Sequence, residues 1–355
     1  MNLTNILALS LALSFAPCLP AADHLTFDGK DGPGKGKHLV LLAGDEEYRS
    51  EEAIPMLAKI LSQRHGFKCT VLFSADDDGT IRPAKAESLT HPEALDSADA
   101  IVMLLRWRHW NPEAEAKFQS AVNRGIPIVG LRTSTHAFRK GTALGGFGKD
   151  VLGEEWVEHW GKHRVQATRG VIEKGAENEA ILRGVTDVFG TTDVYEVYPP
   201  KDAKILIRGQ VLKGMLPTDA AADSRKNRKT DNEEQGINDP MMPVAWTREI
   251  PNSAGKTNRI LCTTMGASMD LPNESLRRLV VNGVYWGLGL DVPQQADVSF
   301  VDPYEPTMYG MNTSIPGLKV DDLGLGKALP KAQAASAPAA EGRSPKATPQ
   351  TQSSK

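Results

Sequence analysis

The sequence predicts an α/β fold in which helices cover both faces of a mostly parallel sheet. In the first half of the chain, short apolar runs alternate with segments that carry apolar residues at helical spacing. A strand covered on both faces is apolar throughout, so continuous apolar runs between helices are typical of a parallel sheet. The 355 residues, 40% of them hydrophobic, suffice for one large domain or two.

The individual elements follow from these periods. Helices are expected at residues 53–65 and 112–124, where apolar residues recur at helical spacing. Asn111 is a natural N-cap for the second helix, Pro112 suits its first position, and Glu113 suits its dipole. Apolar strands are expected at residues 38–44, 68–73, 98–105 and 126–131.

The second half of the chain is less regular. Strands are expected at residues 204–212, 242–250 and 259–265, and an amphipathic helix at 273–288. Residues 219–236 are highly charged and are expected to form a surface loop.

The N-terminus has the pattern of an export signal. The apolar stretch at residues 6–16 is too short to span a bilayer, and small residues near Ala22 suit cleavage. We therefore expect a soluble secreted or periplasmic protein. The tail is rich in Ala, Pro, Lys, Ser and Gln, which is typical of disorder. The expected divisions are a signal peptide at 1–22, a flexible lead-in at 23–36, a folded domain at 37–292, an extended segment at 293–316 and a disordered tail at 317–355.

Charge and cysteine content exclude some classes of function. The net charge of −3 provides no basic field, so no nucleic-acid partner is expected. No later apolar run is long enough for a transmembrane helix. Once the signal is removed, Cys69 and Cys262 remain within apolar runs, and we expect both to be buried and unpaired. The alternative is one disulfide between them in an oxidising compartment.

Unusual polar residues follow several of the predicted strands. In a doubly wound sheet, ligands bind beyond the carboxyl ends of the strands, where the strand order reverses. With the strand order 2-1-3-4, the loops after the first, third and fourth strands would lie side by side. The sequence therefore predicts a crevice at this edge of the sheet.

The loop after the first strand, GDEEYRSEE, is strongly acidic. Asp45, Glu46 and Glu47 offer carboxylates for proton transfer or for binding a cation or sugar hydroxyls. The alternative is a structural role at a helix N-terminus, with Ser50 as the cap. The loop lacks a Gly-rich phosphate-binding pattern, so a nucleotide cofactor is not expected. Further candidates for substrate binding in this loop are Tyr48 and Arg49.

The loops after the third and fourth strands carry arginines, a tryptophan and a histidine. In RWRHW, Arg106 and Trp107 offer a guanidinium and an indole, which suit carboxylates and sugar rings. In RTSTHAF, Arg132 and Thr133 are candidates for substrate binding. They interrupt the G-x-S-x-G pattern of a nucleophile elbow, so a serine nucleophile is not expected. His136 is a candidate acid, base or ligand, and a structural histidine is the alternative.

No metal or other cofactor is predicted, although a divalent metal is left open. His159 and His163 are four residues apart, as metal ligands on a helix can be, but the H-E-x-x-H pattern is absent and Gly161 disfavours a helix. In TTMGASMD, Gly266 permits a tight turn and Ser268 could reach a ligand. Turn chemistry alone also explains that segment.

Several separated segments together resemble secreted proteins with a ThuA-like (trehalose utilisation) domain. They are HLVLLAGDEEYRSEEAIPMLAKILSQRHGF, GLRTSTHAF, NDPMMPVAWT and TTMGAS, and the resemblance covers residues 38–290. It implies a flavodoxin-like three-layer sandwich of the class I glutamine amidotransferase type. It also implies a carbohydrate ligand, either a di- or oligosaccharide or a keto-sugar derivative.

The resemblance does not extend to glutaminase chemistry, because no cysteine stands at the strand-four turn where the amidotransferases have theirs. Ala267 follows Gly266 where other ThuA-like proteins carry a histidine, so no role of that histidine transfers. One hypothesis is a carbohydrate-active hydrolase, lyase or isomerase; the other is a non-catalytic carbohydrate-binding or scaffold module. Both hypotheses are compatible with a homo-oligomer. In the enzyme hypothesis, the proton carriers are Glu46, Glu47 and His136, and an oxygen is polarised by Arg106 and Arg132.

Overall fold

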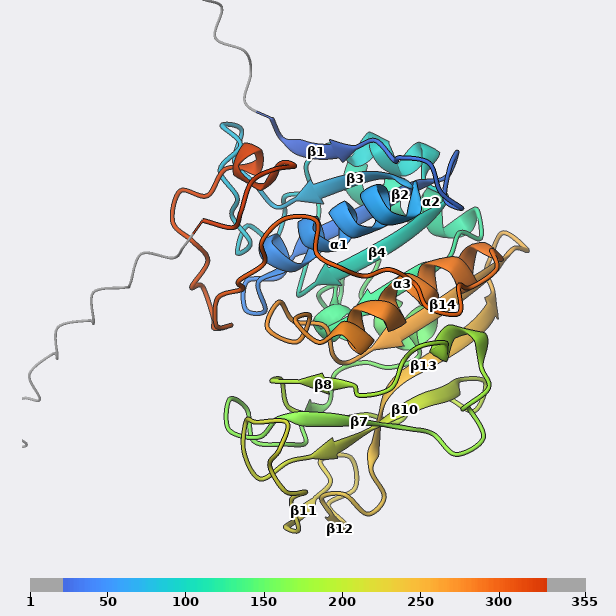
Figure 1. Ribbon diagram of the computed structural model, residues 1–355, viewed down its shortest axis with the longest axis vertical. Helices are drawn as coiled ribbons and strands as arrows, with labels where there is room; N and C mark the ends of the chain where they lie inside the picture. Colours follow the sequence, from blue (N-terminus) through green and yellow to red (C-terminus); the bar gives the residue numbers. More distant parts are fainter. Residues whose placement is uncertain (1–21, 331–355) are drawn as a thin grey trace, which may run out of the picture.

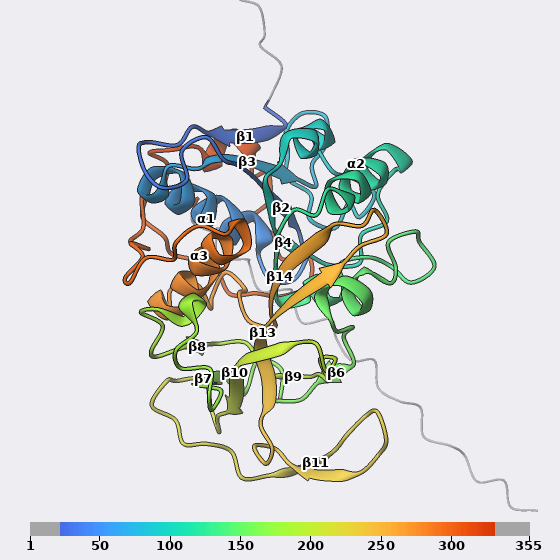
Figure 2. The ribbon, with the colours of Figure 1, turned by 90° about the vertical axis from the view of Figure 1, so that its right-hand side faces the viewer.

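The computed structural model of the protein describes residues 22–330, which contain a sheet of ten strands flanked by helices (Figure 1). Figure 2 shows α1 (Ser50–His65) and α3 (Glu274–Leu288) on one face of the sheet and α2 (Pro112–Asn123) on the other. This arrangement confirms the predicted three-layer α/β sandwich. Across the sheet, the strands are β1 (His24–Phe27), β3 (Lys68–Phe73), β2 (His38–Gly44), β4 (Ala100–Leu105), β5 (Ile128–Leu131), β14 (Thr257–Thr263), β13 (Met242–Pro251), β10 (Lys204–Val211), β7 (Thr168–Ile172) and β8 (Phe189–Gly190).

Short elements complete the described part of the chain. Two-stranded ribbons are formed by β6 (Glu158–His159) with β9 (Tyr195–Glu196), and by β11 (Arg225–Asn227) with β12 (Glu234–Gly236). Within residues 22–330, no helix has the length and apolar character needed to cross a membrane. The short helical segments are η1 (Pro92–Ser97), η2 (Arg132–His136), η3 (Gly148–Leu152), η4 (Ala180–Leu182) and η5 (Val320–Leu323).

The parallel part of the sheet has the predicted strand order. Strands β3, β2, β4, β5 and β14 run parallel to one another. Every residue of β4 and β5 is buried, as expected for strands with helices on both faces. Cys69 and Cys262 lie in this region and are buried and unpaired, as predicted. The carboxyl ends of β2, β4 and β5 therefore meet at one edge.

The other strands pair antiparallel and extend the sheet away from the three helices. Strand β13 pairs with β14 on one side and β10 on the other, and β7 and β8 follow. In Figure 1 this extension forms the lower half of the molecule. It brings the segment between β8 and β9 back toward the edge where β2, β4 and β5 end, as its contacts described below show.

Two of the expected boundaries are wrong. Residues 24–27 are not a flexible lead-in, because β1 pairs with β3 and buries Leu25 and Phe27. The tail does not lose its structure at residue 317, because η5 buries Val320 and Leu323. In both segments, two apolar side chains pack into the main hydrophobic core. The signal peptide expected before Ala22 and the tail beyond residue 330 lie outside the described residues.

The N-cap of α2 offers a local test of this structure. Asn111 Oδ1 accepts a hydrogen bond from the Ala114 N–H at 2.9 Å, as predicted. Replacement Asn111→Ala should lower the free energy of unfolding by about 1 kcal/mol, because that N–H loses its partner. Urea denaturation would measure the loss. Asn111→Ser is the control, since serine also caps helices, and equal losses in both variants would contradict the capping role.

Candidate functional site

The loops that follow β2, β4 and β5 converge on one small cleft. The Trp107 N–H donates to the His136 carbonyl at 3.0 Å, which joins the loops after β4 and β5. Glu47, Arg106 and His136 line a cleft of about 20 Å³. Such a volume holds about one water molecule. The other lining residues are Tyr48, Trp107, Trp156, His159 and Tyr195.

Each of the three loops contains one residue with a strained, left-handed backbone. Arg49, Trp107 and Arg132 have φ values of 60°, 49° and 41°, a left-handed region that non-glycine residues seldom adopt. Strain of this kind costs roughly 1–3 kcal/mol per residue and persists where surrounding contacts impose it. Of these three residues, Trp107 lines the cleft, and Arg132 packs against Tyr195 of its lining.

Glu46 is held by two arginines. Its carboxylate accepts hydrogen bonds from Arg106 Nη1 and, at 3.1 Å, from Arg108 Nη2. Arg108 is buried and also donates to the Pro83 carbonyl at 2.8 Å. Both carboxylate oxygens of Glu46 are therefore engaged in positioning these guanidinium groups, a role that the sequence did not predict.

His163 connects Glu47 to Asp193. Its Nε2 lies 3.3 Å from Glu47 Oε1, and its Nδ1 lies 3.1 Å from Asp193 Oδ1. The hydrogen bond to Asp193, followed by that to Glu47, raises the pKa of His163 to about 9. Burial by itself would raise the pKa of Glu47, but His163, Arg106 and Arg132 outweigh burial and lower it. Glu47 is therefore ionised at neutral pH.

Arg132 is fully buried beneath the cleft and does not face it directly. It donates to the carbonyls of Asp193 at 2.6 Å and Thr264 at 2.8 Å, and to Asp193 Oδ1 at 3.1 Å. Its guanidinium carbon lies 3.8 Å from the centre of the Tyr195 ring. Burial would raise the pKa of Asp193, but Arg132 and the two neighbouring histidines outweigh it and hold that pKa well below its usual range. Arg132 thus fixes Asp193 rather than contacting a substrate.

His136 presents a neutral imidazole to the cleft. Burial, with the nearby Arg106 as the next cause, lowers the pKa of His136 well below its usual value. Its Nδ1 lies 3.2 Å from Thr135 Oγ1, and within residues 22–330 no group hydrogen-bonds to Nε2. The rings of Trp107 and Trp156 lie 4.8 and 5.5 Å from its ring. A neutral imidazole with a free nitrogen can accept a proton.

Two candidate substrate ligands bond to each other instead. Thr133 Oγ1 donates to Asp45 Oδ2, and the Asp45 carboxylate also accepts from the N–H groups of Glu47 and Tyr48 at 2.7 and 2.6 Å. Asp45 is completely buried, and burial raises its pKa. Ser134 Oγ donates to the Met103 carbonyl at 3.0 Å, so its hydroxyl is engaged in the core.

The remaining candidates also lie outside the cleft lining. Arg49 donates to the Met308 carbonyl at 3.1 Å and to Thr313, so it anchors the C-terminal segment. The Gly266 N–H donates to Asp270 Oδ2 at 3.0 Å, and Ser268 is buried. Arg49 itself is the N-cap residue of α1, so the expectation that Ser50 caps this helix is wrong. The Ser50 hydroxyl instead accepts from the Asp45 N–H at 2.9 Å.

Sequence patterns did not point to Asp193, Tyr195 or Trp156. The pairing of β6 with β9 sets His159 beside Tyr195, and His159 Nδ1 lies 2.7 Å from Asp193 Oδ2. His159 and His163 therefore meet across a strand and a turn, not on a helix. The alternation of Asp193 and Tyr195 places both on one side of an extended segment, which is a faint signal in a single sequence.

The family assignment follows from a match along most of the folded region. The sequence profile described as "ThuA: Trehalose utilisation" matches residues 39–287. The chain belongs to the ThuA family. This ThuA-family protein has no significant match among curated proteins. The matched range contains every loop that contributes to the cleft.

Solved structures similar to this ThuA-family protein include two ThuA-like proteins. That of Parabacteroides merdae has 12% identity and a TM-score of 0.49, and the match covers 73% of this chain and 92% of that one. That of Bacteroides uniformis has 15% identity and a TM-score of 0.46, over 73% of this chain and 93% of that one. The N-terminal domain of mmIFT52 is similar at 12% identity and a TM-score of 0.40, over 71% and 97% of the two chains.

Proposed function

We propose that this ThuA-family protein binds a di- or oligosaccharide, or a keto-sugar derivative, beside Trp107 and transfers a proton on it through His136. The observation that carries the proposal is the convergence of a neutral imidazole, an ionised carboxylate and a guanidinium on one cleft. These groups belong to His136, Glu47 and Arg106. The family description, trehalose utilisation, supports a carbohydrate as the ligand.

The sugar ring would occupy a groove next to the cleft. The cleft admits only a water-sized group, such as one hydroxyl or carbonyl oxygen. A groove of about 290 Å³ shares Trp107 with it and is also lined by Glu46, Arg108, Arg139 and Asn312. This volume is near the lower end of the range for ligand pockets, roughly 300–1,000 Å³. Trp107 offers an indole for packing against a sugar ring, and the polar residues offer hydrogen bonds.

The chemistry follows from the charge state of each group. In the tautomer in which His136 Nδ1 donates to Thr135 Oγ1, Nε2 has a lone pair and accepts the proton of a carbon or hydroxyl group. Arg106 lies in the same cleft and stabilises negative charge that develops on a neighbouring oxygen. Glu47 stays ionised and offsets the positive charge that His136 acquires.

Replacement His136→Gln tests the proposed proton transfer. Turnover should fall by roughly 10²–10⁴-fold, the usual contribution of a general base, because glutamine has no basic nitrogen. The assay would compare purified proteins on a panel of di-, oligo- and keto-saccharides, with calorimetry measuring affinity. His109→Gln, in the same loop as Trp107 but outside the cleft lining, is the matched control.

The same experiment separates the two candidate functions. Equal turnover by the wild type and His136→Gln would remove His136 from the mechanism. Saccharide binding without turnover across the panel would favour a non-catalytic binding module. That alternative draws support from Thr133 and Ser134, whose hydroxyls are engaged in the core and leave no nucleophile at the strand-four turn.

A further inference from the structure

We propose that His159, His163 and Asp193 bind one divalent transition-metal ion at the wall of the cleft, with zinc as the best fit to these donors. This inference concerns metal binding and does not depend on the saccharide proposal. Two imidazoles and one carboxylate form a common ligand set for catalytic zinc, which keeps a further position for water or substrate.

The three side chains are already arranged around one point. One ligand atom from each lies within 4.8 Å of the others. His159 Nδ1 is 2.7 Å from Asp193 Oδ2, and His163 Nδ1 is 3.1 Å from Asp193 Oδ1. With metal–ligand distances of about 2 Å, the ligands of a tetrahedral ion lie roughly 3 Å apart. Small movements would therefore admit the ion.

His163 lies between two carboxylates, and one of them belongs to the proposed ligand Asp193. Its Nε2 faces the Glu47 carboxylate and its Nδ1 faces the Asp193 carboxylate. A metal ion bound at Nδ1 would lie between this nitrogen and the Asp193 carboxylate, and its charge would offset that of the carboxylate.

The surroundings have the features of a second coordination shell. A ligating histidine usually donates its other ring N–H to a carboxylate, as Glu47 allows for His163. Arg132 donates to Asp193 Oδ1 at 3.1 Å and keeps this fully buried carboxylate in place. The metal would thus meet oriented ligands.

The cleft supplies the open coordination position. His159 lines the cleft, and the cleft volume of about 20 Å³ matches a single water molecule. A metal ion here would polarise a bound water or a substrate oxygen.

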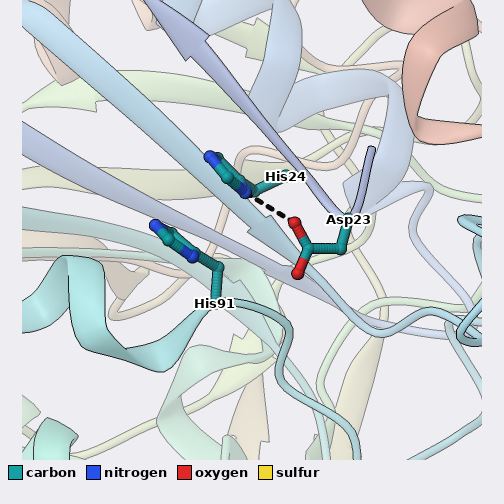
Figure 3. Close-up of side chains that lie close together, drawn as sticks. All are labelled: Asp23, His24 and His91. Atoms are coloured by element: carbon teal, nitrogen blue, oxygen red, sulfur yellow. Dashed lines mark hydrogen bonds and ion pairs between the residues drawn. The ribbon is translucent and has the colours of Figure 1, made fainter. Parts of the chain in front are cut away.

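A second cluster provides both a comparison and a control. Asp23, His24 and His91 also lie within reach of a common ion (Figure 3). However, the rings of His24 and His91 are stacked at 3.8 Å with an interplanar angle of 8°, and His91 Nδ1 pairs with the exposed Glu93 at 2.9 Å. Asp23 has 52% of its side chain exposed. His24 Nδ1 lies 2.6 Å from Asp23 Oδ1, but this carboxylate is exposed, whereas Asp193 is fully buried, so we assign the metal to the cleft cluster.

The test is zinc titration of purified, chelator-treated protein by calorimetry, with bound metal quantified by elemental analysis and no sugar present. We expect one tight site. His159→Gln and His163→Gln should weaken it by at least ~100-fold, and Glu47→Gln by ~10–100-fold, as for outer-shell partners. His91→Gln should leave the affinity unchanged. The proposal is overturned if zinc does not bind, or if His91→Gln abolishes binding while His159→Gln preserves it.

A second measurement avoids dependence on the folding of the cleft variants. X-ray absorption at the zinc edge would be recorded on the His91→Gln protein, which retains the whole cleft cluster. Two imidazole ligands are expected, and fewer than two would overturn the assignment. Because His136→Gln changes no proposed ligand, turnover and zinc binding can fail separately, which distinguishes the two proposals.

Discussion

Replacement Arg132→Met should lower the free energy of unfolding by about 3–5 kcal/mol, the usual cost of removing one partner from a buried ion pair. Arg132 and Asp193 are both fully buried, and Arg132 also donates to the Thr264 carbonyl and the Tyr48 hydroxyl. Methionine fills a similar volume but satisfies none of these acceptors. Asp193 would lose its closest permanent positive charge. Urea or guanidinium denaturation would measure the effect.

The exposed Arg139 provides the matched control for this prediction. Arg139→Met removes the same charge from the same loop, and its effect on stability should stay within about 0.5 kcal/mol. A loss below about 1 kcal/mol for Arg132→Met would show that the histidines beside Asp193 compensate. The buried pair would then not be the element that holds the β9 segment against β5.

Replacement Glu51→Gln should stabilise the protein at alkaline pH and have little effect near pH 4. Glu51 is 1% exposed, its carboxylate oxygens accept no hydrogen bond within residues 22–330, and Arg49 Nη1 lies 3.9 Å away. Burial, with the neighbouring Glu52 as the next cause, raises the pKa of Glu51 from 4.5 to about 8. The folded state therefore binds this proton more tightly than the unfolded state does.

The sign of the pH dependence follows from that difference. The stability contributed by protonated Glu51 is fully present below the unfolded pKa near 4.5 and is lost as pH rises to about 8. At 1.36 kcal/mol per pKa unit, the loss is roughly 3–5 kcal/mol. Glutamine keeps the shape and carries no ionisable proton, so Glu51→Gln should escape it.

Denaturation curves measured between pH 4 and pH 9 would check this expectation. The relevant quantity is the difference between wild type and variant, because other carboxyls, such as Glu154 with a pKa raised to about 7 by burial, titrate in both proteins. Glu87→Gln, at an exposed position, should follow the wild-type curve. Parallel curves for wild type and Glu51→Gln would contradict a buried, protonated carboxyl.

The parallel half of the fold was predictable because its strands and helices are specified by short, local sequence patterns. Strands β2, β4 and β5 are continuous apolar runs, and α2 begins at Asn111 and Pro112. Strand β1 was missed because a run of only four residues, His24–Phe27, carries little periodic signal. Its pairing with β3 depends on residues more than 40 positions away in the chain.

The position of the site was predictable, but the roles within it were not. Parallel strands end at a common edge, so the loops holding Glu47, Arg106 and His136 had to meet. Sequence reasoning could not tell that Glu46 is taken by two arginines or that Thr133 bonds to Asp45. Which neighbour satisfies a polar side chain depends on distances set by the packed chain.

The sequence by itself determined the α/β class, the strand order of the parallel half and the edge where polar loops gather. Periodicity and parallel pairing act over short stretches or follow from topology, so they can be inferred from one chain. Only the tertiary structure decided that Asp193 arrives 61 residues after Arg132 to pair with it, and that His159 and His163 converge on its carboxylate. The physical reason is that a buried charge without a partner is costly. Its partners are therefore the groups that the folded chain places beside it, and these can be distant in sequence.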